Sequence, residues 1–376
     1  MGDVASSFDY GLNAAATEYD GQNKYLRITD IDDETHEFSK SDLTTPLADL
    51  AMSADYLLKE GDLLFARTGA SVGKTYLYRQ FDGMVYFAGF LIRARIGEGA
   101  DPEFAYQATL TDAYKKYVAI TSQRSGQPGV NAQEYADYQL MLPSKTEQQQ
   151  IGMTLRSLDD LITLHQRKYD KLVIFKKSML EKMFPKDGES VPEIRFAGFT
   201  DPWEQRELVD IAEIVGGGTP DTNNSNYWDG DIDWYAPAEL GNNIYAESST
   251  RKITQAGFDS CSTKMLPADK TILFTSRAGI GNTAILRHSA CTNQGFQSLV
   301  IGDADVYFVY SMSERIKKWA EEKASGSTFL EISGRQLETM PVNLPSLVEQ
   351  QAIGSFFSHL DDLITLHQRK RLWFAK

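Results

Sequence analysis

The chain has 376 residues, which is enough for two domains of ordinary size, each with its own hydrophobic core. It contains no run of about eighteen apolar residues and no signal-peptide pattern, which excludes a bilayer-spanning helix and predicts a cytoplasmic protein. Cys261 and Cys291 do not belong to CxxC pairs, so neither a disulfide framework nor a zinc cluster is indicated, and both thiols are expected to be reduced.

The formal net charge of -14 argues against binding to nucleic acid, because proteins that neutralise phosphates usually carry a basic surface. The charges are not evenly spread, however. From His165 to Lys186 the chain carries seven lysines and arginines against only Asp170 and Glu181. A local basic region therefore exists, and the acidic surface elsewhere can face protein partners or solvent.

The first part of the chain is predicted to mix short strands with one helix. Residues Tyr25–Ile31, Gly61–Arg67 and Tyr86–Ile96 have strand-like patterns, and Glu103–Val118 has a helical one. The segment Gly69-Ala-Ser-Val-Gly73-Lys74-Thr75 resembles a P-loop, but three residues instead of four separate its glycines. We therefore interpret it as a glycine-rich turn after a strand and not as a nucleotide site.

A long helix is predicted from about Thr146 to Phe184. Apolar residues, together with His165, recur at alternating spacings of four and three from Ile151 to Leu172, which is the pattern of a coiled-coil seam. Pro143 and Ser144 stand just upstream as helix-start signals. At 1.5 Å per residue the helix would be on the order of 55 to 60 Å long. It could therefore act as a spacer longer than one turn of duplex DNA.

An internal repeat organises the chain. Leu158-Asp-Asp-Leu-Ile-Thr-Leu-His-Gln-Arg-Lys168 recurs without a change as Leu360-Asp-Asp-Leu-Ile-Thr-Leu-His-Gln-Arg-Lys370, 202 residues further along, and Glu147-Gln-Gln recurs as Glu349-Gln-Gln. A second long helix is therefore predicted at the end of the chain. Helix packing alone tolerates any apolar residue of suitable size. Because the polar residues are repeated too, the pattern indicates one partner that binds both copies.

A second lobe is predicted between the repeated helices. Its predicted strands are Ile232–Pro237, Thr271–Arg277 and Gln297–Ile301, and its predicted helix is Val306–Lys323. Both lobes are of the α+β class. The predicted domains are a first lobe (1–143), a central helix (144–185), a linker that leads into the second lobe (186–207), the second lobe (208–344) and a C-terminal helix (345–376).

The two lobes are expected to share a fold and to differ in surface. Phe65-Ala-Arg-Thr-Gly69 resembles Phe274-Thr-Ser-Arg-Ala-Gly279 only loosely, unlike the repeated helices. Met1-Gly-Asp-Val4 aligns with Leu208-Val-Asp-Ile211, so the first lobe lacks an equivalent of Phe196–Glu207, and the second helix stops at Lys376. Truncation, circular rearrangement and a switchable gene segment are the explanations left open.

Three segments together point to one family. They are Leu142-Pro-Ser-Lys-Thr-Glu-Gln-Gln-Gln-Ile151, its copy Leu344-Pro-Ser-Leu-Val-Glu-Gln-Gln-Ala-Ile353, and Pro192-Glu-Ile-Arg-Phe-Ala-Gly-Phe199, which Trp203-Glu-Gln-Arg-Glu-Leu208 follows. With these segments the chain resembles, over nearly its whole length, the specificity (S) subunits of type I restriction-modification systems. The resemblance implies two target-recognition lobes related by a pseudo-twofold axis and separated by two long antiparallel coiled-coil helices.

The resemblance also implies a division of labour. Each lobe would recognise one half of a split site in double-stranded DNA, and the helices would bind two modification (methyltransferase) subunits. Those subunits would carry S-adenosylmethionine, and two restriction subunits would use ATP and Mg to translocate and cut DNA. This chain would hold no cofactor and no metal, and it would have no catalytic residue. No methyl-donor motif is found in its sequence.

Side chains of the types that contact base edges and phosphates occur in loops of both lobes. In the first lobe the predicted DNA-binding residues are Arg67, Lys74, Gln123, Arg124 and Gln127. In the second lobe they are Asn223, Asn224, Tyr227, Arg277, Asn282 and Gln294. The predicted partner-binding residues on the helices are Leu158, Asp159, Ile162 and Arg167, with their copies Leu360, Asp361, Ile364 and Arg369.

Other functions are weighed against this one. An acidic protein-interaction scaffold that does not bind DNA is the main alternative, and an ATPase or nuclease is the third. His165 and His367 lie on the predicted seam without nearby ligands, which favours packing over metal binding. Adjacent carboxylates such as Asp159 and Asp160 do not face one another on a helix, so a solvated or partner-binding face explains them better than acid-base chemistry.

Overall fold

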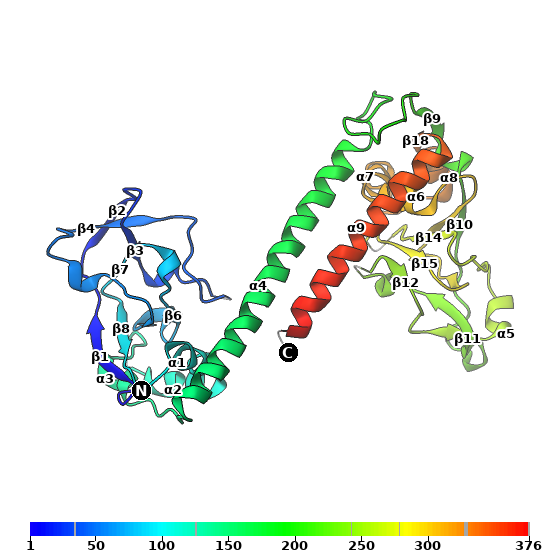
Figure 1. Ribbon diagram of the computed structural model, residues 1–376. Helices are drawn as coiled ribbons and strands as arrows, with labels where there is room; N and C mark the ends of the chain where they lie inside the picture. The colour runs from blue at the N-terminus through cyan, green and yellow to red at the C-terminus, as the bar shows by residue number, and fades with distance from the viewer. Residues whose placement is uncertain (34, 125, 242, 278, 327–329, 375–376) are drawn as a thin grey trace. The chain divides into compact units, whose positions relative to one another are not determined.

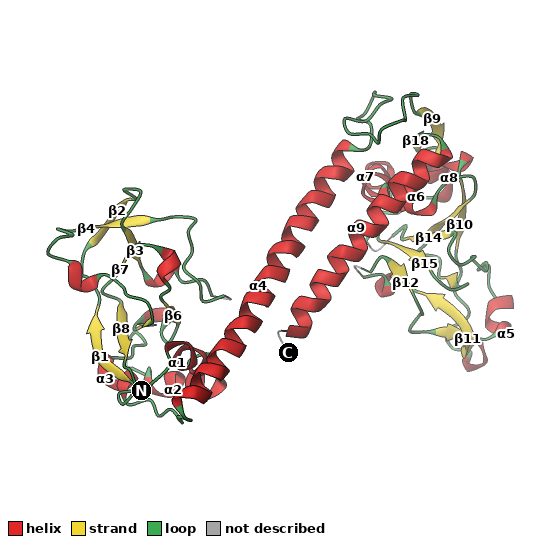
Figure 2. Ribbon diagram, viewed as in Figure 1, coloured by secondary structure: helices red, strands yellow, loops and turns green. Residues whose placement is uncertain are grey.

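The structure is a computed structural model that describes residues 1–33, 35–124, 126–241, 243–277, 279–326 and 330–374. Ala278 of the predicted glycine-rich segment lies outside these residues. The chain divides into two compact units, one of residues 1–165 with 370–376 and one of residues 166–369. Each unit contains an α+β lobe and part of a long helix (Figure 1, Figure 2), so the predicted fold class is confirmed. No helix formed by the described residues is long and apolar enough to cross a bilayer.

The main sheet of the first unit contains four antiparallel strands in the order β1-β8-β5-β6. Its strand β5 (Asp62–Ala66) is buried along its whole length. Leu63 and Phe65 pack into one hydrophobic core and Leu64 and Ala66 into another, because alternate side chains of a strand point to opposite faces. The other strands of this unit are β1 (Ala5–Tyr10), β2 (Ala15–Glu18), β3 (Lys24–Leu26), β4 (Thr44–Leu47), β6 (Thr75–Leu77), β7 (Val85–Phe87) and β8 (Leu91–Ile96).

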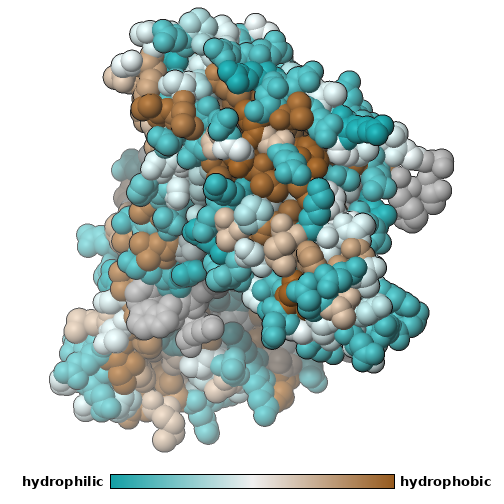
Figure 3. Space-filling model, turned by 90° about the vertical axis from the view of Figure 1, so that its right-hand side faces the viewer, coloured by the Kyte–Doolittle hydropathy of each residue, from teal (hydrophilic) through white to brown (hydrophobic). Residues whose placement is uncertain are grey.

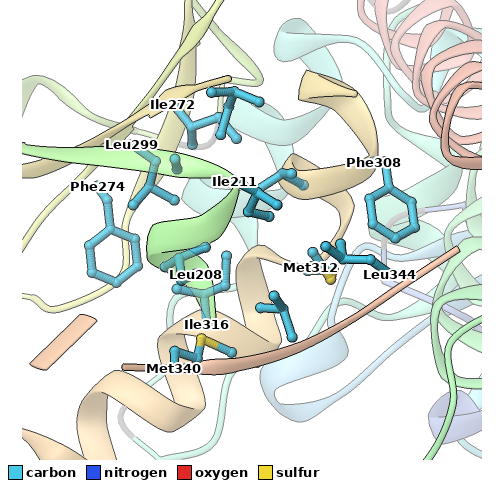
Figure 4. Close-up of a cluster of buried hydrophobic side chains, with 14 of the residues drawn as sticks. Leu208, Ile211, Ile272, Phe274, Leu299, Phe308, Met312, Ile316, Met340 and Leu344 are labelled. Carbon is cyan, nitrogen blue, oxygen red and sulfur yellow. The ribbon is translucent and has the colours of Figure 1, made fainter. Parts of the chain in front are cut away.

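The main sheet of the second unit has the order β10-β17-β14-β15-β12. Its first four strands repeat β1, β8, β5 and β6 in order and antiparallel direction, which confirms that the two lobes share a fold. The largest core lies where this sheet meets the helices, and Leu208, Phe274, Leu299 and Phe308 are among its side chains (Figure 4). The strands are β10 (Ala212–Gly216), β12 (Tyr245–Ala246), β14 (Thr271–Phe274), β15 (Thr283–Leu286) and β17 (Gln297–Ile301).

Two smaller sheets complete the second unit. One has the order β13-β11-β16, where β11 is Trp228–Tyr235, β13 is Lys252–Ile253 and β16 is Cys291–Thr292. Trp228 and Trp234 lie edge to face in its small core, with ring centroids 5.1 Å apart. In the other sheet, β9 (Glu204–Glu207) pairs antiparallel with β18 (Pro341–Leu344).

The helix predicted in each lobe is broken into two. In the first unit, α1 (Pro102–Ala108) ends and α2 (Asp112–Thr121) begins after Thr111, whose side chain caps α2 by accepting a hydrogen bond from Tyr114 N at 3.3 Å. The second unit has the same break at Met312, between α6 (Val306–Ser311) and α7 (Ser313–Lys323). Helical periodicity continues across both breaks, so the pattern alone could not locate them.

Three predicted strands are shorter than expected or divided. The predicted strand Thr271–Arg277 is reduced to β14, which ends at Phe274. The predicted strand Tyr25–Ile31 is extended only at Tyr25 and Leu26, the end of β3, and continues as a 3-10 turn, because the Asp30 carboxylate accepts hydrogen bonds from the backbone and side chain of Arg27. Residues Tyr86–Ile96 form β7 and β8 with a turn between them. The remaining helices are α3 (Ala132–Ala136), α5 (Gln255–Asp259), α8 (Gly334–Glu338) and short 3-10 helices at Ile28–Asp30, Ala54–Tyr56, Gly69–Ser71, Gln80–Asp82, Leu208–Asp210, Ser225–Tyr227 and Pro237–Glu239.

The two long helices are α4 (Lys145–Lys182) and α9 (Leu347–Phe374), close to the predicted bounds. Helix α4 runs through both units, and its part in the second unit packs against α9 (Figure 1). Lys176 forms a 2.6 Å ion pair with Asp361, and the rings of Phe184 and Phe357 stack with centroids 6.2 Å apart. Since Phe184 follows Lys176 whereas Phe357 precedes Asp361, the two segments run antiparallel, as predicted.

The two cysteines lie in different surroundings. Cys291 is buried in β16, and desolvation raises the pKa of its thiol to about 12. Cys261 is only half-buried. Because the thiolate is the reactive form, we expect one thiol of the native protein to react with Ellman's reagent at pH 8 and both to react in guanidinium chloride. Fast reaction of two thiols in the native protein would contradict the burial of Cys291.

Candidate nucleic-acid interface

Each lobe is fixed to its long helix by the same hydrogen bonds. In the first unit the side-chain oxygen of Gln148 accepts a hydrogen bond from Asp101 N at 3.0 Å, and in the second Gln350 accepts one from Asp305 N at 3.1 Å. The side-chain amide of each glutamine donates to the carbonyl of the proline five residues before it, at 2.9 Å and 3.0 Å. The repeated Glu-Gln-Gln motif therefore attaches the start of each helix to its lobe.

A glycine in each long helix makes this attachment possible. Asp101 and Asp305 cap the first helices of their lobes by accepting hydrogen bonds from backbone amides at 2.9 Å and 2.8 Å. A Cβ atom at Gly152 would lie 2.8 Å from the Asp101 carboxylate, and one at Gly354 would lie 2.2 Å from that of Asp305. Any larger residue would push the lobe away from the helix.

In the first lobe the structure brings Arg67 and Gln127 together. The carbonyl of Arg67 accepts a hydrogen bond from Val130 N at 2.9 Å, and the amide of Gln127 lies 2.9 Å from where a Cβ atom of Gly69 would stand. The guanidinium of Arg67 lies over the ring of Tyr10, 5.0 Å from its centroid, and its Nε is buried with no hydrogen-bond partner among the described residues. Arg67 therefore lies against an aromatic ring and carries one donor that no described residue satisfies.

The other three predicted residues of the first lobe lie apart from Arg67 or are engaged elsewhere. Lys74 forms an ion pair with Asp33, and its side chain is mostly buried. Arg124 forms an ion pair with Glu134 and donates to the carbonyl of Gln123 at 3.0 Å. A bound phosphate would have to compete with these carboxylates, so Lys74 and Arg124 are weaker candidates than the sequence indicates.

In the second lobe Arg277 and Gln294 are neighbours. A Cβ atom at Gly295, the residue after Gln294, would lie 3.5 Å from Nε of Arg277. Gln294 is exposed and accepts a hydrogen bond from the hydroxyl of Thr219. Asn282 is half-buried at the start of β15, where its backbone amide donates to the hydroxyl of Thr275 at 2.9 Å. Arg277 and Gln294 thus form one group at the end of the sheet.

The remaining predicted residues of the second lobe lie in the loop and 3-10 helix that precede β11 of the small sheet. Asn224 uses its side-chain oxygen to accept a hydrogen bond from Asn226 N at 3.1 Å, and Tyr227 packs against the tryptophan core. Asn223 is exposed, and its amide donates to Asp221 at 3.3 Å. Asn224 and Tyr227 therefore shape this loop, and Asn223 is the better candidate for contact with a ligand.

Three exposed residues next to these groups were not predicted. Tyr10 and Phe90 flank Arg67, since Tyr10 lies under its guanidinium and the Phe90 carbonyl accepts a hydrogen bond from Arg67 N at 3.0 Å. Arg251 is exposed on the small sheet and lies 3.7 Å from the ring centroid of Trp228. Strand pairing brings Tyr10 and Phe90 to Arg67 from distant parts of the sequence, so no local motif could have revealed them.

The two glycine-rich turns have the same backbone hydrogen bonds, but these bonds do not make Arg67 and Arg277 equivalent. Backbone hydrogen bonds place Ser276, and not Arg277, in the position of Arg67. The turn leads into a strand in both lobes, whereas a P-loop leads into a helix. Gly73 and Gly281 have φ angles of 86° and 87° and lie against side chains of the lobe helices. The interpretation as a strand-to-turn element is confirmed.

The predicted partner-binding residues lie in unlike surroundings despite their identical sequence. Leu360 and Asp361 are buried in the second unit, where Asp361 accepts a hydrogen bond from the hydroxyl of Tyr307 at 2.8 Å and pairs with Lys176. Asp159 is exposed and accepts a hydrogen bond from Gln107 at 2.6 Å. The aspartates therefore attach each helix to its own lobe, which is a second reason for their repetition.

Other predicted positions on the helices remain accessible. Leu158, Ile162 and Ile364 are half-buried, and Arg167 and Arg369 are exposed. Four leucines that were not predicted are exposed to a similar extent in both copies of the helix. They are Leu161 (37%) and Leu164 (45%) in α4 and Leu363 (46%) and Leu366 (45%) in α9. Leu360 and Asp361, by contrast, are buried although their counterparts in α4 are not.

The surface of the second unit is mixed. Figure 3 shows hydrophobic side chains gathered in the upper half of one face and surrounded by hydrophilic ones. Among the described residues, no three histidines, cysteines or carboxylates are grouped as they would be around a metal ion. The arrangement thus offers polar and aromatic loops at the lobes and apolar side chains on the helices.

The repeat of lobe and helix has counterparts in known proteins. A sequence model of the type I restriction modification DNA specificity domain matches residues 12–173 and again residues 200–372. The chain belongs to this type I specificity family. The two matches correspond to the two copies of lobe and helix, so duplication of the specificity domain explains the internal repeat.

Individual members of the specificity family are similar to this chain to different extents. The MjaIX specificity subunit of Methanocaldococcus jannaschii is 38% identical over 168 residues, which is 43% of this chain and 38% of that protein. The HindI specificity subunit of Haemophilus influenzae is 21% identical over 348 residues, covering 74% of this chain and 75% of that protein. A crystal structure of a type I restriction-modification S subunit from M. genitalium, 14% identical, has the same fold, with a TM-score of 0.63 over 100% of this chain and 91% of that one.

Proposed function

We propose that the chain recognises a split DNA site, one half with each lobe, within a type I restriction-modification complex. The observation that carries this proposal is the repeat itself. The hydrogen bonds that attach lobe to helix are the same in both units, whereas the loops around Arg67 and Arg277 differ in length and in side chains. Identical attachment with different loops is what two recognition lobes for unlike sequences require.

In this proposal the helices bind two copies of one modification subunit. Leu161 with Leu164, and Leu363 with Leu366, give each copy the same exposed apolar pair at a spacing of three, which lies on one helix face. An exposed apolar pair that is repeated in both helices suits two identical partners. S-adenosylmethionine would belong to the modification subunits, ATP and Mg would belong to two restriction subunits that join them, and this chain would be non-catalytic.

Arg277 offers a direct test of DNA recognition. Because arginine next to a polar loop can donate two hydrogen bonds to guanine, we expect Arg277→Ala to weaken binding to the cognate site by about 1 to 3 kcal/mol, or about 5- to 150-fold. The measurement is a gel shift of the complex with its modification subunit, together with sequencing of the methylated sites. Sequence preference should change in one half of the site only.

Arg287→Ala is the matched control for this test. Arg287 lies at the other end of β15, where it pairs with Asp269 at 2.9 Å. Its removal alters the net charge equally but should leave both affinity and methylated sequence unchanged. Equal effects of the two substitutions would show that Arg277 acts through charge alone and has no part in sequence recognition.

An acidic scaffold without affinity for DNA is the second candidate. It is favoured by the net charge of -14 and by the pairing of Lys74 with Asp33 and of Arg124 with Glu134. Binding to duplex DNA that weakens steeply as salt is raised would support DNA recognition, because released counterions give that dependence. Failure of the complex with the modification subunit to shift any duplex at low salt would favour the scaffold.

A further inference from the structure

Several arginines of the protein lie over aromatic rings, and they are of two kinds. In Arg93, Arg287 and Arg315 the guanidinium also donates hydrogen bonds to a carboxylate or a backbone carbonyl, so the chain itself uses its donors. Arg67 and Arg251 differ, because neither guanidinium has a hydrogen-bond acceptor or a carboxylate partner among the described residues. One of these two arginines belongs to each lobe.

The side chain of Arg251 lies on a firm support. Its guanidinium carbon is 3.7 Å from the ring centroid of Trp228 and 5.6 Å from that of Trp234. Both indoles are buried, and their N–H groups donate to the carbonyls of Asp221 at 3.1 Å and Gly218 at 2.9 Å. Arg251 itself is exposed. The rings limit the orientation of its guanidinium before any ligand binds, which lowers the entropy that binding costs.

The charges around Arg251 favour contact with a base edge over contact with a phosphate. The neighbouring Lys252 is paired with Asp233 at 2.8 Å, and Asp229 and Asp231 are exposed on the adjacent strand β11. A surface that binds phosphates is normally rich in cations, and these carboxylates would repel a phosphate. A base edge carries no net charge, so the same carboxylates do not oppose contact with it.

Asn223 adds a second side chain of the kind that contacts bases. Asp221, whose carbonyl accepts the N–H of Trp228, also accepts hydrogen bonds from the backbone amide of Asn223 at 2.9 Å and from its side-chain amide at 3.3 Å. Asn223 is exposed. Trp228 thus connects Arg251 with Asn223, and the usual pairings of these two residue types are with guanine and adenine.

We infer that Arg251, supported by Trp228, recognises a guanine in the half-site of the second lobe, at a base pair different from the one that Arg277 contacts. The inference rests on the proposed DNA recognition. Arg277 lies at the end of the main sheet, whereas Arg251 lies on the sheet of β11, β13 and β16. The counterpart of Arg67 with respect to its aromatic support is therefore Arg251. Two lobes of one fold place such an arginine on different elements, which suits the recognition of different sequences.

The test uses the full chain in complex with its modification subunit, and the probe is duplex DNA that carries the site methylated by the unaltered complex. We expect Arg251→Ala to lower the affinity for this site about 5- to 150-fold. Sequencing of methylated DNA should show relaxed preference at one position, in the same half of the site as the position that Arg277→Ala affects but distinct from it. Arg251→Lys keeps the charge without the planar fork of donors, so it should not restore the preference.

Arg287→Ala is again the matched control, because Arg287 also lies on a ring, 3.8 Å from the centroid of Tyr245, but pairs with Asp269. It should leave affinity and methylated sequence unchanged. If Arg277→Ala alters the methylated sequence and Arg251→Ala does not, the inference is wrong and the proposed function stands. An equal loss of affinity for every duplex, with a weaker salt dependence, would assign Arg251 to a phosphate and also overturn the inference. Failure of the unaltered complex to bind any duplex would refute the proposed function itself.

Discussion

We expect Glu349→Ala to destabilise the second unit by about 3 kcal/mol, because it leaves the guanidinium of Arg195 buried without its charge partner. The side chain of Glu349 is 1% exposed and that of Arg195 is 12% exposed, and the carboxylate, which also raises the pKa of Arg195, accepts two of its hydrogen bonds. The repeat supplies the matched control. Glu147→Ala removes the same residue from the same motif, but Glu147 is exposed, so its loss should cost no more than about 0.5 kcal/mol.

Hydrogen exchange in increasing urea can measure the two units separately, which matters because a chain with two units need not unfold in one step. The amides of β18 and of the first turns of α9 should lose protection in Glu349→Ala, and those of the first unit should not. The double exchange Arg195→Glu with Glu349→Arg should recover part of the loss. Similar protection in Glu349→Ala and Glu147→Ala would mean that the Arg195 contact contributes little to stability.

The repeated helices could be predicted from sequence because their signals are local. Proline and serine before Glu147 and Glu349 mark the starts, and the apolar spacing continues for many turns, so the observed bounds of α4 differ from the predicted ones by one or two residues. The α+β lobes followed from strand and turn patterns in the same way. The breaks within the lobe helices did not, because Thr111 and Met312 interrupt hydrogen bonding without interrupting the apolar period.

The candidate site was harder to predict because it depends on contacts between distant residues. Lys74 and Arg124 have the right chemistry for DNA, but the fold supplies each with a carboxylate partner. The identical sequences around Asp159 and Asp361 show most clearly what sequence alone cannot predict. One aspartate is exposed, and the other is buried between Lys176 and Tyr307, and no property of the repeated segment itself separates them. Such differences arise from tertiary packing alone.

A large loss of affinity for the modification subunits is expected when the exposed leucines of the helices are replaced. Leu161→Asp and Leu363→Asp each place a charge on an accessible apolar face, where a partner interface would lose about 2 to 4 kcal/mol, or about 30- to 1,000-fold in affinity. Each single substitution should remove one modification subunit from the complex, and the double substitution should remove both. Native mass spectrometry would then show two, one and no modification subunits bound to the chain.

Ile174→Asp separates this role from a general effect of charge on the helix. Ile174 is 69% exposed on α4, but the position 202 residues further along is a lysine, so it does not belong to a repeated face. It should leave two modification subunits bound. The leucines are exposed, so the variants should keep the helical content of the unaltered chain by circular dichroism. If the double variant still bound two modification subunits, the repeated leucines would not be the docking face, and the duplication of the helices would have to be explained by their attachment to the lobes alone.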